Sequence, residues 1–288
     1  MTSSYAPVII IGMHRSGTTM VARVLESLGL FVGKNKEGNH EALFFHHINE
    51  WFLSQCGGTW DHPDPIHSLI ENQDARTLAT NYIERYLLKS PRTIGFLGSK
   101  NYLRYRDLHN IEFPWGWKSP LNSYTFPLWL DLFPDAKLIH IYRHGVDVAQ
   151  SLRTRGRRQM RLSKFQKLYY DLDFLHWIRP KPGYFIESVR CDSLEGGLSL
   201  WEGYLSESRR HVTKMGERAM EVKYEDFLIE PNDTLQRLAA FCGLTASAAD
   251  IERAAQRVRK ERAYAYRRNP ELRAFAEQVQ NRLIAHSY

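Results

Sequence analysis

The stretch Val8-Ile-Ile-Ile-Gly-Met-His-Arg-Ser-Gly-Thr-Thr19 decides the predicted fold. Its apolar start predicts a buried strand, and a loop bounded by Gly12 and Gly17 follows directly. A helix is then expected over residues 18–28, because apolar residues recur there at helical spacing until Gly29. A strand, a glycine-bearing loop and a helix in this order predict a parallel, layered α/β domain.

The rest of the chain continues this pattern without an internal repeat or a low-complexity linker. We therefore predict an α/β fold with a P-loop-type central parallel sheet, flanked by helices and carrying helical insertions, in a single domain over residues 1–288. Further strands are predicted at residues 115–118, 137–142 and 220–224. Helices are predicted at residues 41–55, with Asn39 as the cap, and at 69–88, 123–133, 198–214 and 233–242, and another begins at Val146.

The composition limits the class of protein. Of the residues, 43% are hydrophobic and 25% are charged, which is typical of globular proteins. No apolar run approaches the roughly 20 residues of a membrane span. Residues 1–7 contain no Lys or Arg, and the apolar run after them is too short for a signal peptide. We therefore expect a cytoplasmic protein with no transmembrane segment.

The net charge of +7 favours anionic ligands in general, including phosphates, acidic glycans, nucleic acid and lipid head groups. No helix-turn-helix, RNA-binding sheet motif or zinc spacing is present, so we expect no nucleic-acid partner. The three cysteines, Cys56, Cys191 and Cys242, are odd in number and far apart, which favours neither a disulfide framework nor a zinc site.

The loop from Gly12 to Thr19 has the residues that a phosphate site needs. Backbone N–H groups converge on an anion at a helix N-terminus, and glycines allow close approach. The frame is that of a Walker A loop, except that Thr18 stands where the lysine belongs and Arg15 supplies the charge. The strand at 137–142 ends in Arg143, where a P-loop kinase needs an acidic residue for Mg²⁺. The sequence therefore favours a phosphate-bearing ligand bound without a metal, rather than Mg·ATP.

Four motifs in order resemble those of sulfotransferases that use 3′-phosphoadenosine 5′-phosphosulfate (PAPS), of the bacterial type and with similarity to the tyrosylprotein sulfotransferases. The resemblance implies an enzyme that transfers a sulfuryl group from PAPS to a hydroxyl acceptor. The motifs are Arg15-Ser-Gly-Thr-Thr19; Arg143 with Ser151; Trp117-Lys-Ser-Pro120 followed by Leu132-Phe-Pro-Asp-Ala-Lys137; and Val222-Lys-Tyr-Glu-Asp226 with the later Phe241-Cys-Gly-Leu244.

The same resemblance implies roles for individual residues. Arg15 would act at the bridging and sulfuryl oxygens, and Lys118 would act with it on the leaving group. Arg155 lies one helical turn beyond Ser151 and is placed to reinforce the 3′-phosphate site. The implied donor site comprises Ser16, Gly17, Thr18 and Thr19 at the 5′-phosphate, Arg143 and Ser151 at the 3′-phosphate, and Tyr224 near the adenine.

The acceptor hydroxyl needs a general base within hydrogen-bond reach. Relatives place a glutamate after the first helix, but Phe45 stands at that position here. We favour Glu41 as the substitute, on the inward face of a helix that it would share with Phe44 and Ile48. Histidines have pKa values suited to the same task. The rivals are His46, His47 and, more weakly, His40.

The identity of the acceptor stays open. A glycan, glycolipid or small-molecule alcohol is the first candidate, and a phenol or a tyrosine is an alternative. The run from Arg153 to Lys167 has seven basic residues, which form either a solvated face or a contact with an acidic acceptor. Residues 56–88 and 165–195 are the insertions expected to build the acceptor pocket. The basic segment 257–268 has no assigned role.

Two alternatives remain to sulfuryl transfer. One is a P-loop kinase or nucleotidase, and the other is a non-catalytic, polyanion-binding relative of the sulfotransferase fold. The sequence also leaves open whether the protein is a homodimer.

Overall fold

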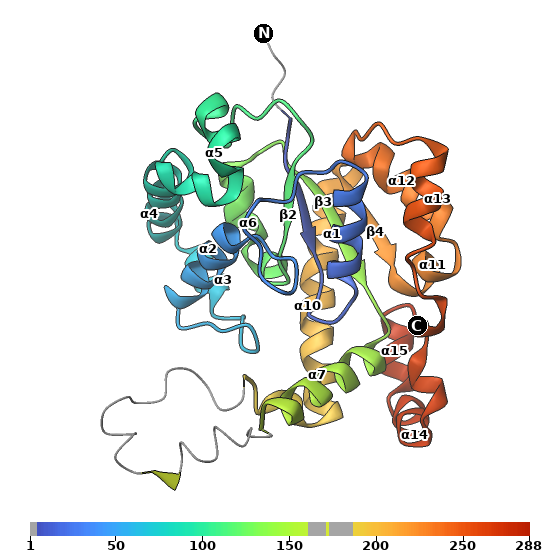
Figure 1. Ribbon diagram of the computed structural model, residues 1–288. Helices are drawn as coiled ribbons and strands as arrows, with labels where there is room; N and C mark the ends of the chain where they lie inside the picture. The colour runs from blue at the N-terminus through green and yellow to red at the C-terminus, as the bar shows by residue number, and fades with distance from the viewer. Residues whose placement is uncertain (1–4, 161–170, 173–186) are drawn as a thin grey trace. The chain divides into compact units, whose positions relative to one another are not determined.

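The computed structural model describes residues 5–160, 171–172 and 187–288. Its centre is one parallel sheet, as predicted, and the strand order is β2-β1-β3-β4 (Figure 1). The strands are β1 (Val8–Ile11), β2 (Gly116–Lys118), β3 (Lys137–Tyr142) and β4 (Ala219–Lys223). The α/β class with a P-loop-type sheet is confirmed.

The register brings the carboxyl ends of the strands to one edge of the sheet. Ile10 of β1 pairs with Lys118 on one side and with Ile139 on the other. Tyr142 at the end of β3 pairs with Lys223 at the end of β4. In parallel sheets this edge is where ligands bind. The loop after β1, Lys118 at the end of β2, Arg143 after β3 and Tyr224 after β4 therefore all lie at the edge where a ligand is expected.

Apolar side chains cover both faces of β1, whose four residues are all buried, as parallel strands require. The helices α1 (Thr18–Ser27), α12 (Pro231–Cys242) and α13 (Ala248–Ala255) share one hydrophobic core with the sheet. That core includes Val21, Leu25, Ile139, Val222, Leu235 and Ile251.

A helical insertion lies beside β2 in Figure 1 and precedes α6 (Asn122–Leu132), which packs against β1. The insertion comprises α2 (Leu43–Ser54), α3 (Ile66–Glu71), α4 (Gln73–Ile83) and α5 (Ile94–Tyr105), with the short turns η1 (Glu84–Leu88) and η2 (Pro91–Thr93). No helix in the described ranges is long and apolar enough to cross a membrane.

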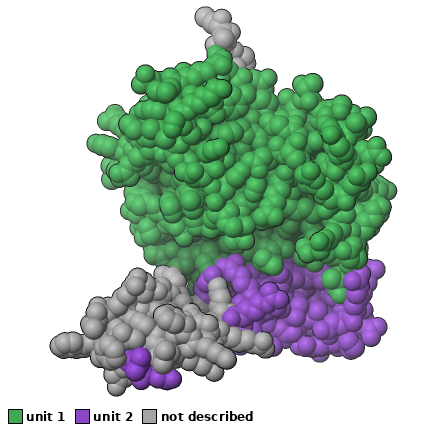
Figure 2. All heavy atoms as spheres, viewed as in Figure 1, with its two compact units in different colours: residues 1–144, 202–265 green, residues 145–201, 266–288 purple. Residues whose placement is uncertain are grey.

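The chain divides into two compact units, coloured separately in Figure 2. The first unit, residues 1–144 and 202–265, holds the sheet together with α11 (Tyr224–Ile229), η4 (Gly216–Arg218) and η5 (Lys260–Arg262). The second unit, residues 145–201 and 266–288, holds α7 (Gly145–Met160), η3 (Arg190–Asp192), α14 (Pro270–Gln278) and α15 (Gln280–Ala285). Residues of α10 (Leu194–Met215) and η6 (Ala265–Arg268) belong to both. The single domain stays a prediction.

Three element predictions were wrong in detail. The helix expected at 69–88 is divided, because Asn72 is extended and its side chain caps α4 by accepting from the Ala75 N–H. Asn39 does not cap α2, which begins at Leu43 after Ala42. The strand expected to end at Tyr224 ends one residue earlier, and Tyr224 begins α11.

Candidate active site

The loop between β1 and α1 turns through three residues with positive φ, two of them glycines. Gly12 and Gly17 have φ angles of 136° and 96°, and Arg15 between them also has a positive φ of 71°. A Cβ on Gly12 would lie 2.1 Å from the carbonyl oxygen of Ile141 on β3. The Gly12 N–H donates to Ser123 Oγ at 3.2 Å, which ties the loop to the start of α6. The glycines and Ser123 together fix the path of the loop.

One buried polar group in this loop has no protein partner among the described residues. Ser16 is fully buried, and its Oγ has no hydrogen-bond partner among the residues that the structure describes. Within the same described part of the chain, no side chain caps the start of α1 and no acidic residue stands in its first turn. A buried hydroxyl normally has a partner, and a helix start attracts anions. The loop is therefore built to accept an anionic group such as a phosphate.

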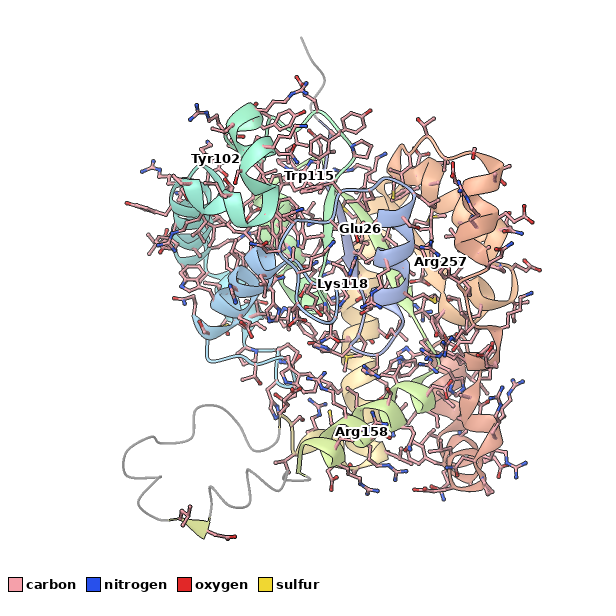
Figure 3. The ribbon with its side chains drawn as sticks, viewed as in Figure 1. Glu26, Tyr102, Trp115, Lys118, Arg158 and Arg257 are labelled. Carbon is pink, nitrogen blue, oxygen red and sulfur yellow. The ribbon has the colours of Figure 1, made fainter. Side chains whose placement is uncertain are left out.

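Lys118 ends β2 beside this loop, with only 3% of its surface exposed (Figure 3). Its Nζ donates to Glu41 Oε1 at 2.7 Å and to the carbonyl oxygen of Asn39 at 3.1 Å. The same carbonyl accepts from Thr19 Oγ1 at 2.9 Å. One backbone oxygen therefore joins the start of α1 to the buried ammonium group.

Glu41 is as buried as Lys118, but it does not lie on a helix as predicted. It comes two residues before α2, in a segment folded back by the pairing of Lys36 with Ala42. Burial alone raises the pKa of Glu41, but the nearby His46 ring and the charge of Lys118 outweigh it and lower this pKa to about 2. Glu41 is therefore an ionised partner for Lys118, whose own pKa is lowered by burial against the opposing effect of Glu41.

His46, on the first turn of α2, lies between two carboxylates. Its Nδ1 is 3.3 Å from Glu41 Oε2, and its Nε2 is 3.4 Å from Glu50 Oε1. The nearby Glu41 carboxylate raises the pKa of His46 in spite of partial burial. His47 is exposed, and His40 pairs with Glu26 of α1. Of the three rival histidines, His46 is the one whose ring lies within ion-pair distance of Glu41.

Arg143 leaves the carboxyl end of β3 and lies against the phosphate loop. Its guanidinium is 4.8 Å from the centre of the Tyr224 ring, and it donates to the backbone oxygens of Arg15 at 3.5 Å and Arg262 at 3.3 Å. The Tyr224 ring also backs the loop, because a Cβ on Gly17 would lie 2.3 Å from its Cδ2. The edge formed by β3 and β4 thus brings Arg143, Tyr224 and the loop together.

The model of the sulfotransferase family matches residues 7–248, a range that contains the loop, Lys118, Arg143 and Tyr224. The chain belongs to the sulfotransferase family. This confirms the family that the motifs indicated.

Solved structures agree with this assignment at the level of the fold. The sulfotransferase from Alicyclobacillus acidocaldarius has a TM-score of 0.50 and 16% identity, over 99% of this chain and 94% of that one. The sulfotransferase domain from the curacin biosynthetic pathway has the same TM-score and identity, over 96% of this chain and 99% of that one. A comparison with curated protein sequences gives no match.

Phe45 in this sulfotransferase is a core residue, which explains why no base stands at its position. It is fully buried and stacks on Trp117 with ring centroids 3.9 Å apart and an interplanar angle of 3°. It also makes edge contacts with Phe96 and Trp129. The side chain therefore joins α2 to β2 and to the aromatic core around it.

The remaining predicted donor residues lie in the second unit, on α7. Ser151 is half-buried there, and Arg155 pairs with Glu187. The other described arginines with ion pairs in the basic run also face acids of the same unit: Arg153 with Glu271 at 2.7 Å and Arg157 with Asp192 at 3.5 Å. Arg161, Lys164 and Lys167 lie outside the described residues, as does most of the insertion at 165–195. The paired arginines weaken the argument for an acidic acceptor.

Sequence reasoning missed two contributors to the sulfotransferase site. The Asn39 carbonyl carries no sequence signal, because every residue has one. Arg262 falls in the basic segment 257–268, whose charge was the available signal, and its carbonyl accepts from Arg143. In the described residues, no three His, Cys, Asp or Glu side chains are grouped as a metal site.

Proposed function

We propose that this sulfotransferase moves a sulfuryl group from PAPS to a hydroxyl acceptor at the carboxyl edge of its sheet. The observation that carries the proposal is the oxygen of Asn39, which accepts from both Thr19 and Lys118. It keeps a buried cation next to a phosphate-binding helix start. Stabilising the charge that develops on a leaving phosphate is the main task in this kind of transfer.

The donor would be held by the residues of the loop and of the neighbouring strand ends. The buried Ser16 hydroxyl and the N–H groups of Gly17, Thr18 and Thr19 suit the 5′-phosphate. Arg143, whose guanidinium lies over the ring of Tyr224, suits the 3′-phosphate. Tyr224 near the adenine, and Ser151 and Arg155 at the 3′-phosphate, remain part of the proposal. To bind the 3′-phosphate, Arg155 would have to break its ion pair with Glu187.

Arg15 and Lys118 would share the stabilisation of the leaving group. Arg15 is exposed on the loop, whereas Lys118 is enclosed. A buried lysine tends to lose its proton, and the Glu41 carboxylate at 2.7 Å opposes that loss. We therefore assign Glu41 the task of keeping Lys118 positively charged.

The same contacts favour His46 over Glu41 as the general base. Glu41 has a pKa of about 2, and its oxygens already face Lys118, His46 and Ser119. His46 has a raised pKa and a carboxylate on Nδ1 that orients the ring. In this assignment Nε2 takes the proton of the acceptor hydroxyl, and Glu50, which is exposed, gives way to the acceptor.

For the base, His46→Asn is expected to lower kcat by about 10²–10⁴-fold, the usual contribution of general-base catalysis. In the unsubstituted enzyme, kcat/KM should rise with pH through a pKa above 6.5, because His46 must lose its proton to act. His47→Asn, at the exposed neighbour, is the matched control and should leave the rate unchanged. If His46→Asn keeps a normal rate and Glu41→Gln has no activity, Glu41 rather than His46 is the general base.

The donor is tested by thermal shifts. Adenosine 3′,5′-bisphosphate in EDTA, at about 100 times its Kd, should stabilise the protein by roughly 2.7 kcal/mol. Mg·ATP should stabilise it much less, because Arg143 and Thr18 replace the residues that a P-loop kinase uses. Stabilisation by Mg·ATP alone would contradict the proposed sulfotransferase mechanism and favour a kinase or nucleotidase. Binding of the bisphosphate without any transfer would favour the non-catalytic, polyanion-binding alternative.

For the acceptor, a hydroxyl on a glycan, a glycolipid or a small-molecule alcohol remains our proposal. Arg153, Arg155 and Arg157 of α7 are paired with acidic side chains, so they give no reason to expect an acidic acceptor.

A further inference from the structure

Glu225 is a buried carboxylate in the segment Val222-Lys-Tyr-Glu-Asp226, and none of the roles above uses it. It lies in the first turn of α11, directly after β4, with 0% of its surface exposed. Its Oε1 accepts a hydrogen bond from the His144 backbone N–H at 3.0 Å. His144 is the residue that follows Arg143, so this carboxylate binds the main chain immediately beyond the proposed 3′-phosphate ligand.

The register of the sheet explains why the two segments meet. Tyr142 and Lys223 are paired at the ends of parallel strands, so both chains leave the sheet at the same level. The next residues are Arg143 and His144 on one side and Tyr224 and Glu225 on the other. Tyr224 contacts the guanidinium of Arg143, and Glu225 binds the backbone one residue further on. Two consecutive residues therefore hold this segment, Tyr224 at the Arg143 side chain and Glu225 at the main chain of His144.

A carboxylate is an expensive group to bury, and it is retained only where strong hydrogen bonds offset the lost hydration. A charged acceptor binds a backbone N–H more tightly than a neutral one does, and it fixes the position of that N–H more closely. The hydrogen bond would therefore hold the backbone at His144, and with it the direction in which the Arg143 side chain leaves β3. A phosphate ligand needs that direction, because the guanidinium donors form a rigid, planar fork.

We propose that Glu225 is a positioning residue for the 3′-phosphate of the donor and acts through the His144 N–H on Arg143. The proposal rests on the proposed function, since it takes Arg143 as the ligand of that phosphate. Glu225 itself touches no part of the donor in this scheme. Its effect should therefore be seen in the discrimination between nucleotides with and without a 3′-phosphate, rather than in nucleotide binding as a whole.

The test compares the Kd values of adenosine 3′,5′-bisphosphate and adenosine 5′-monophosphate, measured calorimetrically on the full chain. The Kd of the monophosphate divided by the Kd of the bisphosphate isolates the contribution of the 3′-phosphate. Glu225→Ala should reduce the ratio at least about tenfold, the effect of losing one hydrogen bond to a charged group. Glu225→Gln keeps an acceptor oxygen and should retain part of the ratio. In an Arg143→Ala background, where the ratio has already collapsed, Glu225→Gln should change it no further.

The direction in which the Kd ratio changes distinguishes a positioning role of Glu225 from a simple effect of its charge. Removing a negative charge near the site would by itself favour the more highly charged bisphosphate and raise the ratio. Asp226→Asn removes the same charge from the exposed neighbouring residue and is the matched control. A fall in the ratio with Glu225 variants, without a fall in Asp226→Asn, is therefore the expected result.

Two results would overturn the proposal in different ways. If the unsubstituted protein prefers the bisphosphate but Glu225→Ala and Glu225→Gln keep the same ratio, Glu225 has no positioning role and the proposed function stands. If the unsubstituted protein binds both nucleotides equally, the 3′-phosphate site fails and this proposal fails with it. Should Glu225→Ala not fold, the ratio in Glu225→Gln, which keeps the shape of the side chain, decides.

Discussion

Lys118→Ala is expected to abolish measurable sulfuryl transfer and to lower the free energy of unfolding by about 3–5 kcal/mol. The loss of transfer follows from the proposed role of the ammonium group at the leaving phosphate. The loss of stability follows from Glu41, which has 3% of its surface exposed and would be left as an uncompensated buried charge. Urea unfolding and a transfer assay with labelled donor measure the two effects.

Two further variants separate the effects of Lys118 on folding and on catalysis. Lys118→Met with Glu41→Gln removes both charges, so stability should largely return while transfer stays absent. Arg15→Ala should abolish transfer without a comparable loss of stability, because Arg15 is exposed on the loop. Full transfer by Lys118→Ala would remove this residue from the mechanism. Unchanged stability would contradict the buried ion pair itself.

Phe45→Ala is expected to lower the free energy of unfolding by about 3–5 kcal/mol, the cost of emptying a buried phenylalanine site. The ring is fully enclosed and stacks on Trp117, so its loss removes contacts that join α2 to the sheet. Phe44→Ala is the matched control, because Phe44 is partly exposed, and its effect should be much smaller. Thermal or urea unfolding measures both. A small effect of Phe45→Ala would mean that the aromatic core adapts to the loss.

Phe45→Glu tests whether a glutamate at position 45 could serve as the general base. It would place the glutamate of the family pattern among the rings of Phe96, Trp117 and Trp129, so it should unfold the protein rather than supply a base. A folded and more active Phe45→Glu would contradict the assignment of the base to His46.

The sheet could be predicted from the sequence because its signals are local. The apolar run of β1, the glycines after it and the residues that end β2 and β3 each indicate their own structure. Helix boundaries were less secure, since Asn72 interrupts an otherwise helical pattern by capping the next helix. The proposed donor ligands Arg143 and Tyr224 were predictable for the same reason as the strands, because they follow the ends of β3 and β4 directly.

The pairing inside the site could not be predicted. Lys118 and Glu41 are 77 positions apart, and they meet because the segment before α2 folds back over the end of β2. Glu41 was expected to face inward from a helix, and it does lie inside, but from a different kind of segment. The Arg143 contact to the carbonyl of Arg262 spans 119 positions. Such contacts depend on the packing of the whole first unit, which no local pattern encodes.

The two glycines of the phosphate loop constrain the evolution of the enzyme differently. Gly12 faces a main-chain oxygen of β3, which is present whatever residue occupies position 141, so no second substitution can make room there. Gly17 faces the ring of Tyr224, which a smaller side chain could replace. Position 17, although its positive φ favours glycine, is therefore coupled to position 224, whereas position 12 is closed to change. A variant library of this site should hold Gly12 fixed and vary residues 17 and 224 as a pair.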